Sequence, residues 1–304
     1  MDESKNVLEF GKKVSNEENV QQDTPPEEEP KVEQEKPVKP EEKKGLTAKE
    51  IIEKLKAKNK YEEVLLPSRN LLYEEIGLQP DKPIHIRPMT IEEEKVLSTP
   101  RLVKSGQYID RIFESCIYED IPTQKLLSVD RIFILIYLRG ISYGPEYEVQ
   151  IKCPNCSSSF MEEISLNALN VEHAPDDFTG VFHVVLPNSK LNLWYRASRG
   201  EDERNLEKYM QVMNKNFKTD SSDALIKRHA MFINKIEDIV NKIEIEDIIR
   251  NLGVIDSNYL RSCMEDIGFG IDLDIGFTCE RCFHEWDQGL PVDANFFFPR
   301  TKKA

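Results

Sequence analysis

The amino-acid sequence predicts an α+β fold, with a core of helices and β-hairpins. Three features indicate this class. A nearly all-apolar helical segment, 128–140, is followed by stretches in which apolar and polar residues alternate, the pattern of half-buried strands. Two Cys-x-x-Cys pairs each lie between such stretches. A long charged segment of helical character separates the two pairs, so the hairpins that carry them are split along the chain.

Residues 1–45 are predicted to be a disordered acidic arm. This segment is poor in hydrophobic residues and contains five prolines, at positions 25, 26, 30, 37 and 40. It cannot bury enough apolar surface to offset the entropy lost on ordering. Its 13 acidic and 8 basic residues give a charge of −5, which leaves −9 of the total of −14 for the rest of the chain.

An amphipathic helix is predicted over 46–60. Thr47-Ala-Lys-Glu50 has the form of a capping box, in which the threonine and glutamate side chains satisfy backbone amides of the first turn. Ile51, Ile52 and Leu55 then make one narrow apolar stripe. The stripe packs either on the following domain or in the groove of another protein, so these three residues are candidate partner contacts.

Residues 61–145 form the mostly helical N-terminal part of the core. A short strand is predicted at 84–88, and helices are predicted at 90–98, which a second capping box opens, and at 108–117. Ser128 caps the apolar helix that ends at Gly140. Because that helix is apolar on every face, we expect it at the centre of the core.

Three further segments complete the predicted organisation. Residues 146–196 contain the first cysteine hairpin and a second hairpin at 181–196, and residues 269–304 contain the second cysteine hairpin and an aromatic end. Between them, 197–268 is a helical insertion, with helices predicted at 201–214, 222–239, 244–252 and 256–266. The aromatic end includes Phe296, Phe297 and Phe298, which must pack in the chain's own core or against a partner.

The four paired cysteines, Cys153, Cys156, Cys279 and Cys282, are candidate zinc ligands. Four thiolates complete the tetrahedral shell of a structural zinc and leave no open position for water. The 122 residues between Cys156 and Cys279 far exceed the roughly 15–20 of a compact ribbon. Two alternatives stay open: a redox dithiol, which favours a helix N-terminus, and pairs of packed thiols. The other two cysteines, Cys116 and Cys263, are expected to be small core hydrophobes.

Three residues beside the cysteines have candidate roles. Lys152 and Arg281 would offset the net negative charge of a zinc tetrathiolate, although as solvated charges they need no such role. His284 could replace a ligand, but four cysteines already complete the shell.

Composition and motifs exclude several classes of function. A charge of −14 argues against a protein that binds the phosphate backbone or an anionic membrane, because such affinity comes from Lys and Arg. The apolar run 132–138 is far shorter than the roughly 20 residues that cross a bilayer. The sequence has no phosphate-binding glycine loop, nucleophile elbow, His-Glu-x-x-His or dinucleotide fingerprint. We therefore expect a protein that is not an enzyme.

A series of short motifs gives a family resemblance. In order they are Leu65-Leu-Pro-Ser-Arg69 with Tyr73, Ile86-Arg-Pro-Met-Thr90, Leu138-Arg-Gly140, the two cysteine pairs and Phe297-Phe-Pro299. Over residues 61–300 this order resembles the baseplate hub and baseplate assembly proteins of T-even-like contractile-tailed phages. The acidic arm and the insertion 197–268 contain none of these motifs.

The resemblance implies a non-enzymatic structural or chaperone-like assembly role in the tail baseplate. It implies other phage tail and baseplate proteins as partners, with no direct nucleic acid, membrane or small-molecule substrate. The protein would act in the cytoplasm of the bacterial host during assembly, or in the tail baseplate of the virion. Two rivals remain: a zinc-ribbon adaptor of phage transcription or replication, which the acidic charge disfavours, and a hydrolase or transferase with an unrecognised site.

Overall fold

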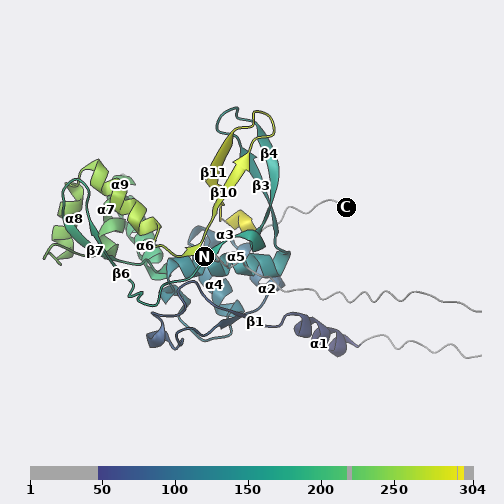
Figure 1. Ribbon diagram of the computed structural model, residues 1–304. Coiled ribbons are helices and arrows are strands. Elements are labelled where there is room, and N and C mark those ends of the chain that lie inside the picture. Colours follow the sequence, from purple (N-terminus) through teal and green to yellow (C-terminus); the bar gives the residue numbers. More distant parts are fainter. Residues whose placement is uncertain (1–46, 218–220, 293, 298–304) are drawn as a thin grey trace, which may run out of the picture. The chain divides into compact units, whose positions relative to one another are not determined.

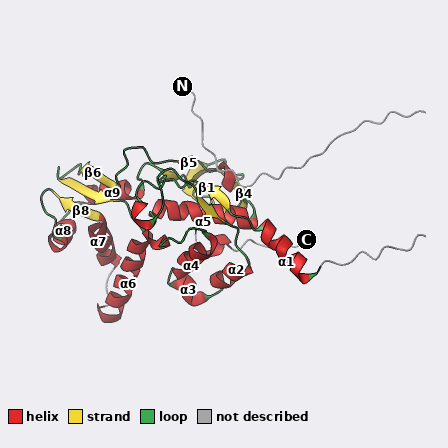
Figure 2. Cartoon of the chain, turned by 90° about the horizontal axis from the view of Figure 1, so that it is seen from below, coloured by secondary structure: helices red, strands yellow, loops and turns green. Residues whose placement is uncertain are grey.

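The computed structural model describes residues 47–217, 221–292 and 294–297 (Figure 1). It confirms the predicted α+β class, since helices are combined with small antiparallel sheets (Figure 2). Of the described residues, those up to Lys60 belong to one compact unit and those from Tyr61 onward to another. The predicted acidic arm, 1–45, and Phe298 lie outside the described residues. No helix in the described part of the chain is long and apolar enough to span a membrane.

The smaller unit contributes helix α1 (Ala48–Lys58), which begins at the predicted capping box. Thr47 Oγ1 accepts a hydrogen bond from the Glu50 amide, and the Glu50 carboxylate accepts one from the Thr47 amide at 2.7 Å. Ile51, Ile52 and Leu55 are 44%, 51% and 57% exposed. Within its own unit, α1 therefore leaves this apolar stripe uncovered.

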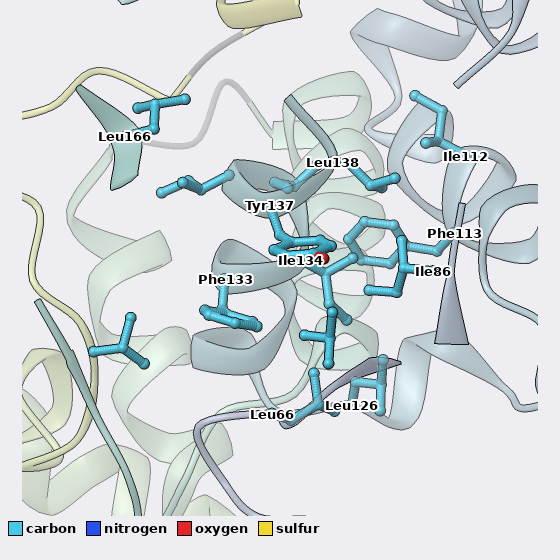
Figure 3. Close-up of a cluster of buried hydrophobic side chains, with 14 of the residues drawn as sticks. Leu66, Ile86, Ile112, Phe113, Leu126, Phe133, Ile134, Tyr137, Leu138 and Leu166 are labelled. Atoms are coloured by element: carbon cyan, nitrogen blue, oxygen red, sulfur yellow. The ribbon is translucent and has the colours of Figure 1, made fainter. Parts of the chain in front are cut away.

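The first core is built around α5 (Ser128–Tyr143), the apolar helix that the sequence places at the centre. Every residue from Phe133 to Gly140 is buried. Figure 3 shows side chains of α5 packed among others from the strands, helices and loops around it. The labelled residues of this contact are Leu66, Ile86, Ile112, Phe113, Leu126, Phe133, Ile134, Tyr137, Leu138 and Leu166.

Short elements surround α5. The helices are α2 (Ile91–Leu97), α3 (Pro100–Lys104) and α4 (Gln107–Cys116), with 3-10 turns η1 (Glu74–Ile76), η2 (Thr123–Lys125), η3 (Leu166–Ala168) and η4 (Ala294–Phe297). The strands are β1 (Glu62–Val64) paired with β2 (Ile84–Ile86), and β5 (Val171–Glu172) paired with β9 (Gly270–Ile271), both antiparallel. The second predicted capping box is present, with Thr90 and Glu93 at the start of α2.

The insertion and the hairpin that precedes it form a second core. Strands β6 (Val181–Val185), β7 (Asn192–Arg196) and β8 (Ile233–Ile236) form one antiparallel sheet. The helices of the insertion are α6 (Gly200–Phe217), α7 (Ser221–Phe232), α8 (Lys242–Arg250) and α9 (Val254–Glu265). The buried residues of this core are Leu186, Leu193, Tyr195, Ala230, Ile233, Ile236, Ile245, Ile249 and Leu260. The hairpin β6–β7 thus packs with the insertion rather than with the first cysteine hairpin.

The predicted helix 222–239 is wrong over its last turns. The chain leaves the helix at Phe232 and continues as β8, whose Ile236 and Lys235 pair with Leu193 and Trp194 of β7. Strand β7 would otherwise be an open edge, and pairing with it buries both Ile233 and Ile236. This non-local pairing overrides the local helical preference of the segment.

A buried ion pair joins the two cores. Arg131 of α5 donates to Asp110 of α4 at 3.0 Å and to the Thr123 carbonyl at 2.8 Å, and Arg204 of α6 also binds Asp110. The first residue of α6 is Gly200, and a Cβ there would lie 2.5 Å from the Arg131 side chain, which would have to shift to make room for it. Both features fix the start of the insertion against α5.

A buried carboxylate holds the N-terminal end of α5. Asp130 is fully buried and accepts hydrogen bonds from the Ser68 amide, at 2.9 Å, and from the Tyr73 hydroxyl. The Tyr73 hydroxyl in turn accepts one from the Leu127 amide at 2.6 Å. Burial raises the pKa of Asp130 to about 6.

This raised pKa predicts a specific pH dependence. The pKa of Asp130 is higher in the folded state than its ordinary value of 3.8, so stability is lost as pH rises from the unfolded to the folded pKa. The expected loss is about 2 kcal/mol between pH 4 and pH 7. Asp130→Asn removes this titration, while all other groups titrate in both proteins. Denaturant unfolding of both proteins across this range measures the difference, and parallel curves would contradict the assignment.

Candidate metal centre

The two cysteine pairs close two similar hairpins. Strand β3 (Glu146–Lys152) pairs with β4 (Ser159–Ser165), and β10 (Asp274–Thr278) pairs with β11 (Glu285–Gly289). Each turn has six residues, which lie between the paired ends Lys152 and Ser159 in one hairpin and between Thr278 and Glu285 in the other. Figure 1 shows the hairpins side by side with both turns at the same end. We call this pair of hairpins the ribbon.

The two turns have the same backbone conformation. In the first, the Cys153 amide donates to the Ser158 carbonyl at 2.9 Å and the Ser157 amide donates to the Cys153 carbonyl at 3.0 Å. In the second, the Cys279 amide donates to the His284 carbonyl at 3.0 Å and the Phe283 amide donates to the Cys279 carbonyl at 2.8 Å.

The residue after the second cysteine is left-handed in both turns. Its φ is 57° at Ser157 and 56° at Phe283. The spacing Cys-x-x-Cys thus gives one local structure twice, and we call each of these turns a knuckle.

The knuckles bring four sulfurs together. All four Sγ atoms lie within 4.8 Å of one another. The Sγ atoms of Cys153 and Cys282 are 3.7 Å apart, and those of Cys156 and Cys279 are 3.6 Å apart. A tetrahedral shell with zinc–sulfur bonds of about 2.3 Å places its sulfurs about 3.8 Å apart, whereas a disulfide needs about 2.05 Å. The spacing fits a tetrahedral metal held by four thiolates.

Hydrogen bonds to the sulfurs adjust how readily they ionise. The Cys282 sulfur accepts hydrogen bonds from the His284 amide and from the Asn155 side chain, whose Nδ2 lies 3.6 Å away. The bond from the His284 amide is the largest cause of a shift that lowers the pKa of Cys282 to about 6. The Ser158 amide lowers the pKa of Cys156, but desolvation and the three neighbouring thiols outweigh it, so that pKa rises to about 11. The Cys282 thiol therefore ionises more readily than the Cys156 thiol, and a bound metal would compete with the proton on Cys156.

Sequence reasoning identified the four cysteines that cluster in space but missed Asn155. Its only signal was a polar side chain between two ligands. Lys152 and Arg281 are exposed, and neither is among the described residues that donate a hydrogen bond to Cys156 or Cys282. Their role in offsetting charge stays a prediction. The His284 ring stacks on Trp286 with centroids 5.9 Å apart and is not one of the four clustered ligands.

Aromatic side chains and a buried arginine support the ribbon. Trp286 contacts Phe160 of the other hairpin and Phe277 of its own, at centroid distances of 6.3 Å and 5.8 Å. At the base, Arg139 of α5 is 2% exposed and donates to three carbonyls. These belong to Phe296, Gly144 and Glu146, at 3.1, 2.7 and 3.3 Å.

The aromatic end is buried beside Arg139, at the base of the ribbon. Phe296 and Phe297 are 0% and 1% exposed, and the Phe296 ring contacts Tyr147 with centroids 4.9 Å apart. Of the two predicted alternatives, packing in the chain's own core accounts for both residues. They offer no exposed surface to a partner.

The fold and site define a class of protein in which a mixed helical and hairpin core carries a cluster of four cysteines that could hold a metal ion. The family model described as "T4 bacteriophage base plate protein" matches residues 71–298. The chain belongs to this family and is a phage baseplate component, as the motif order predicts. No curated protein and no solved structure matches it.

We predict that the full-length protein binds one zinc through the four cysteines. Cys153→Ser or Cys279→Ser should abolish binding, and should lower the free energy of unfolding by more than about 3 kcal/mol because structural zinc contributes roughly 10–16 kcal/mol in small peptides. Cys116→Ser is the matched control, since Cys116 is equally buried but lies outside the cluster. Native mass spectrometry measures the stoichiometry. Metal-free protein, purified without chelator and with six freely alkylated thiols, would contradict the assignment.

Proposed function

We propose that this chain is a non-enzymatic structural or assembly component of the phage tail baseplate, and that zinc pins its fold. The observation that carries the proposal is the extent of the family match. The match covers residues 71–298. It therefore includes Tyr73, which binds Asp130 of α5, as well as both knuckles and the aromatic end. The metal centre is thus part of the region that the family shares, rather than an addition to it.

The chemistry of the centre favours a structural role. Four sulfurs complete a tetrahedral shell, so a bound zinc has no open position at which to activate water. Two of the sulfurs, those of Cys153 and Cys279, are fully buried. When bound, the metal would supply the link that holds the two hairpins together.

Other tail and baseplate proteins are the proposed partners. Helix α1 offers the stripe of Ile51, Ile52 and Leu55, which is about half exposed. The insertion also exposes apolar side chains near the starts of α8 and α9, namely Val240, Ile243, Val254 and Ile255, at 66%, 73%, 75% and 64%. Such exposed apolar groups mark surfaces that another protein covers. The acidic charge argues against the rival reading, a zinc-ribbon adaptor that contacts nucleic acid.

Deletion of the gene from the parent phage tests the proposal. We expect filled heads without functional tails, or incomplete baseplates, while DNA replication and head formation proceed normally in the host cytoplasm. Electron microscopy of the lysate and quantitative DNA measurements give the two readouts. Normal tails, or a replication defect that precedes any assembly defect, would overturn the assignment and favour the adaptor.

The same deletion phage, supplied with variants of the protein, tests the α1 surface. Ile52→Glu with Leu55→Glu places charge on the exposed stripe and should reduce complementation, with zinc content and melting temperature unchanged. Ala57→Glu places one charge on the opposite side of α1 and should complement fully. Equal complementation by both variants would remove α1 from the proposed contacts.

A further inference from the structure

Phe283 lies in the second knuckle, where both its backbone conformation and its exposure to solvent are unfavourable for a phenylalanine. It follows Cys282 directly, has a left-handed φ of 56°, and is 78% exposed. A left-handed backbone is strained for residues with a bulky side chain, and glycine or asparagine is usual there. The exposed ring also leaves apolar surface in water. Neither feature stabilises the folded chain.

The other knuckle shows that the fold does not need this ring. Ser157 occupies the equivalent position with a φ of 57° and is also exposed. The backbone hydrogen bonds of the two knuckles match within 0.2 Å, at 2.9 and 3.0 Å in one and 3.0 and 2.8 Å in the other. A small polar residue therefore closes the turn equally well, and the phenylalanine needs an explanation outside the fold.

Hydrogen bonds within the knuckle fix the backbone that carries the Phe283 ring. The Phe283 amide is bonded to Cys279, and the next amide, that of His284, is bonded to the Cys282 sulfur. The metal ligands on both sides of the turn hold this backbone in place. An apolar anchor that is already ordered loses little entropy when a partner binds it, which is the property of an interface hot spot.

The ribbon around Phe283 is strongly acidic. Residues 146–165 and 274–289 contain eight acidic side chains and two basic ones, a net charge of −6. The acidic residues are Glu146, Glu148, Glu162, Glu163, Asp274, Glu280, Glu285 and Asp287. A zinc ion bound to four thiolates adds further negative charge. These 36 residues thus carry nearly half of the chain's net charge of −14.

We propose that the knuckle end of the ribbon docks Phe283 into an apolar pocket on another baseplate protein, and that basic side chains surround this pocket. The inference rests on the proposed function and names the chemistry of one partner. Charge decides between possible occupants. Nucleic acid would be repelled by the acidic ribbon, and so would a second copy of the same ribbon. A basic protein surface is attracted, and the ring supplies the apolar anchor at its centre.

Complementation of the deletion phage by Phe283→Asn tests the proposal. Asparagine tolerates the left-handed backbone, so zinc content should be retained and the melting temperature should be unchanged or higher. We expect at least a tenfold drop in the yield of complete baseplates. Ser157→Asn makes the corresponding change in the other knuckle, and Ile91→Asn removes an apolar side chain that is 68% exposed on α2. Both controls should complement fully.

Charge reversal and cross-linking identify the occupant. Glu280→Lys with Glu285→Lys should also lower baseplate yield about tenfold, again with zinc retained. A photoreactive benzoylphenylalanine at position 283 should cross-link to a baseplate protein with a basic contact surface, and the Phe283-containing peptide pair is read by mass spectrometry.

These outcomes distinguish a failure of the docking inference from a failure of the baseplate role. Full complementation by Phe283→Asn, or a cross-link to a second copy of this chain or to nucleic acid, would overturn the docking inference while leaving the baseplate role intact. Normal tails in the deletion phage would overturn the baseplate role, and the docking inference would fall with it.

Discussion

The meeting of the four cysteine sulfurs is the constraint on which the rest of the structure depends. Cys156 and Cys279 are separated by 122 residues, yet their sulfurs lie 3.6 Å apart. An isolated two-stranded hairpin is marginally stable in water, and closing a long loop costs entropy that grows only slowly with its length. The packing of Trp286 on Phe160 across the hairpins offsets part of that cost, and a metal held by both knuckles would offset more. The intervening chain then has room to fold around a core of its own.

Helix α5 connects this ribbon to everything else through three buried polar residues. Asp130 holds the loop that contains Ser68 and Tyr73. Arg131 binds α4, and through Asp110 it reaches the first helix of the insertion. Arg139, two turns further along, binds carbonyls at the base of the ribbon and at the aromatic end. An apolar helix packs without specifying its neighbours, and these three side chains provide the specificity.

Local signals in the sequence predicted a large part of this arrangement. Both capping boxes, the all-apolar helix and the two knuckles depend on residues within a few positions of one another, and the structure contains each of them. The contacts that the sequence could not predict join residues that are far apart in the chain. Strand β8 exists because β7 offers it an edge, and β9 pairs with β5 across about 100 residues of chain. The contact of Asn155 with Cys282 depends likewise on the two knuckles meeting in space.

Zinc K-edge X-ray absorption on the full-length protein, purified without added metal, tests the central claim most directly. The account predicts a first shell of four sulfurs at about 2.3 Å with no nitrogen or oxygen ligand. The spectrum should be unchanged by His284→Ala, because the His284 ring stacks on Trp286 and is not one of the clustered ligands. A shell with a histidine nitrogen or a water oxygen, or fewer than four sulfurs, would contradict a closed structural centre.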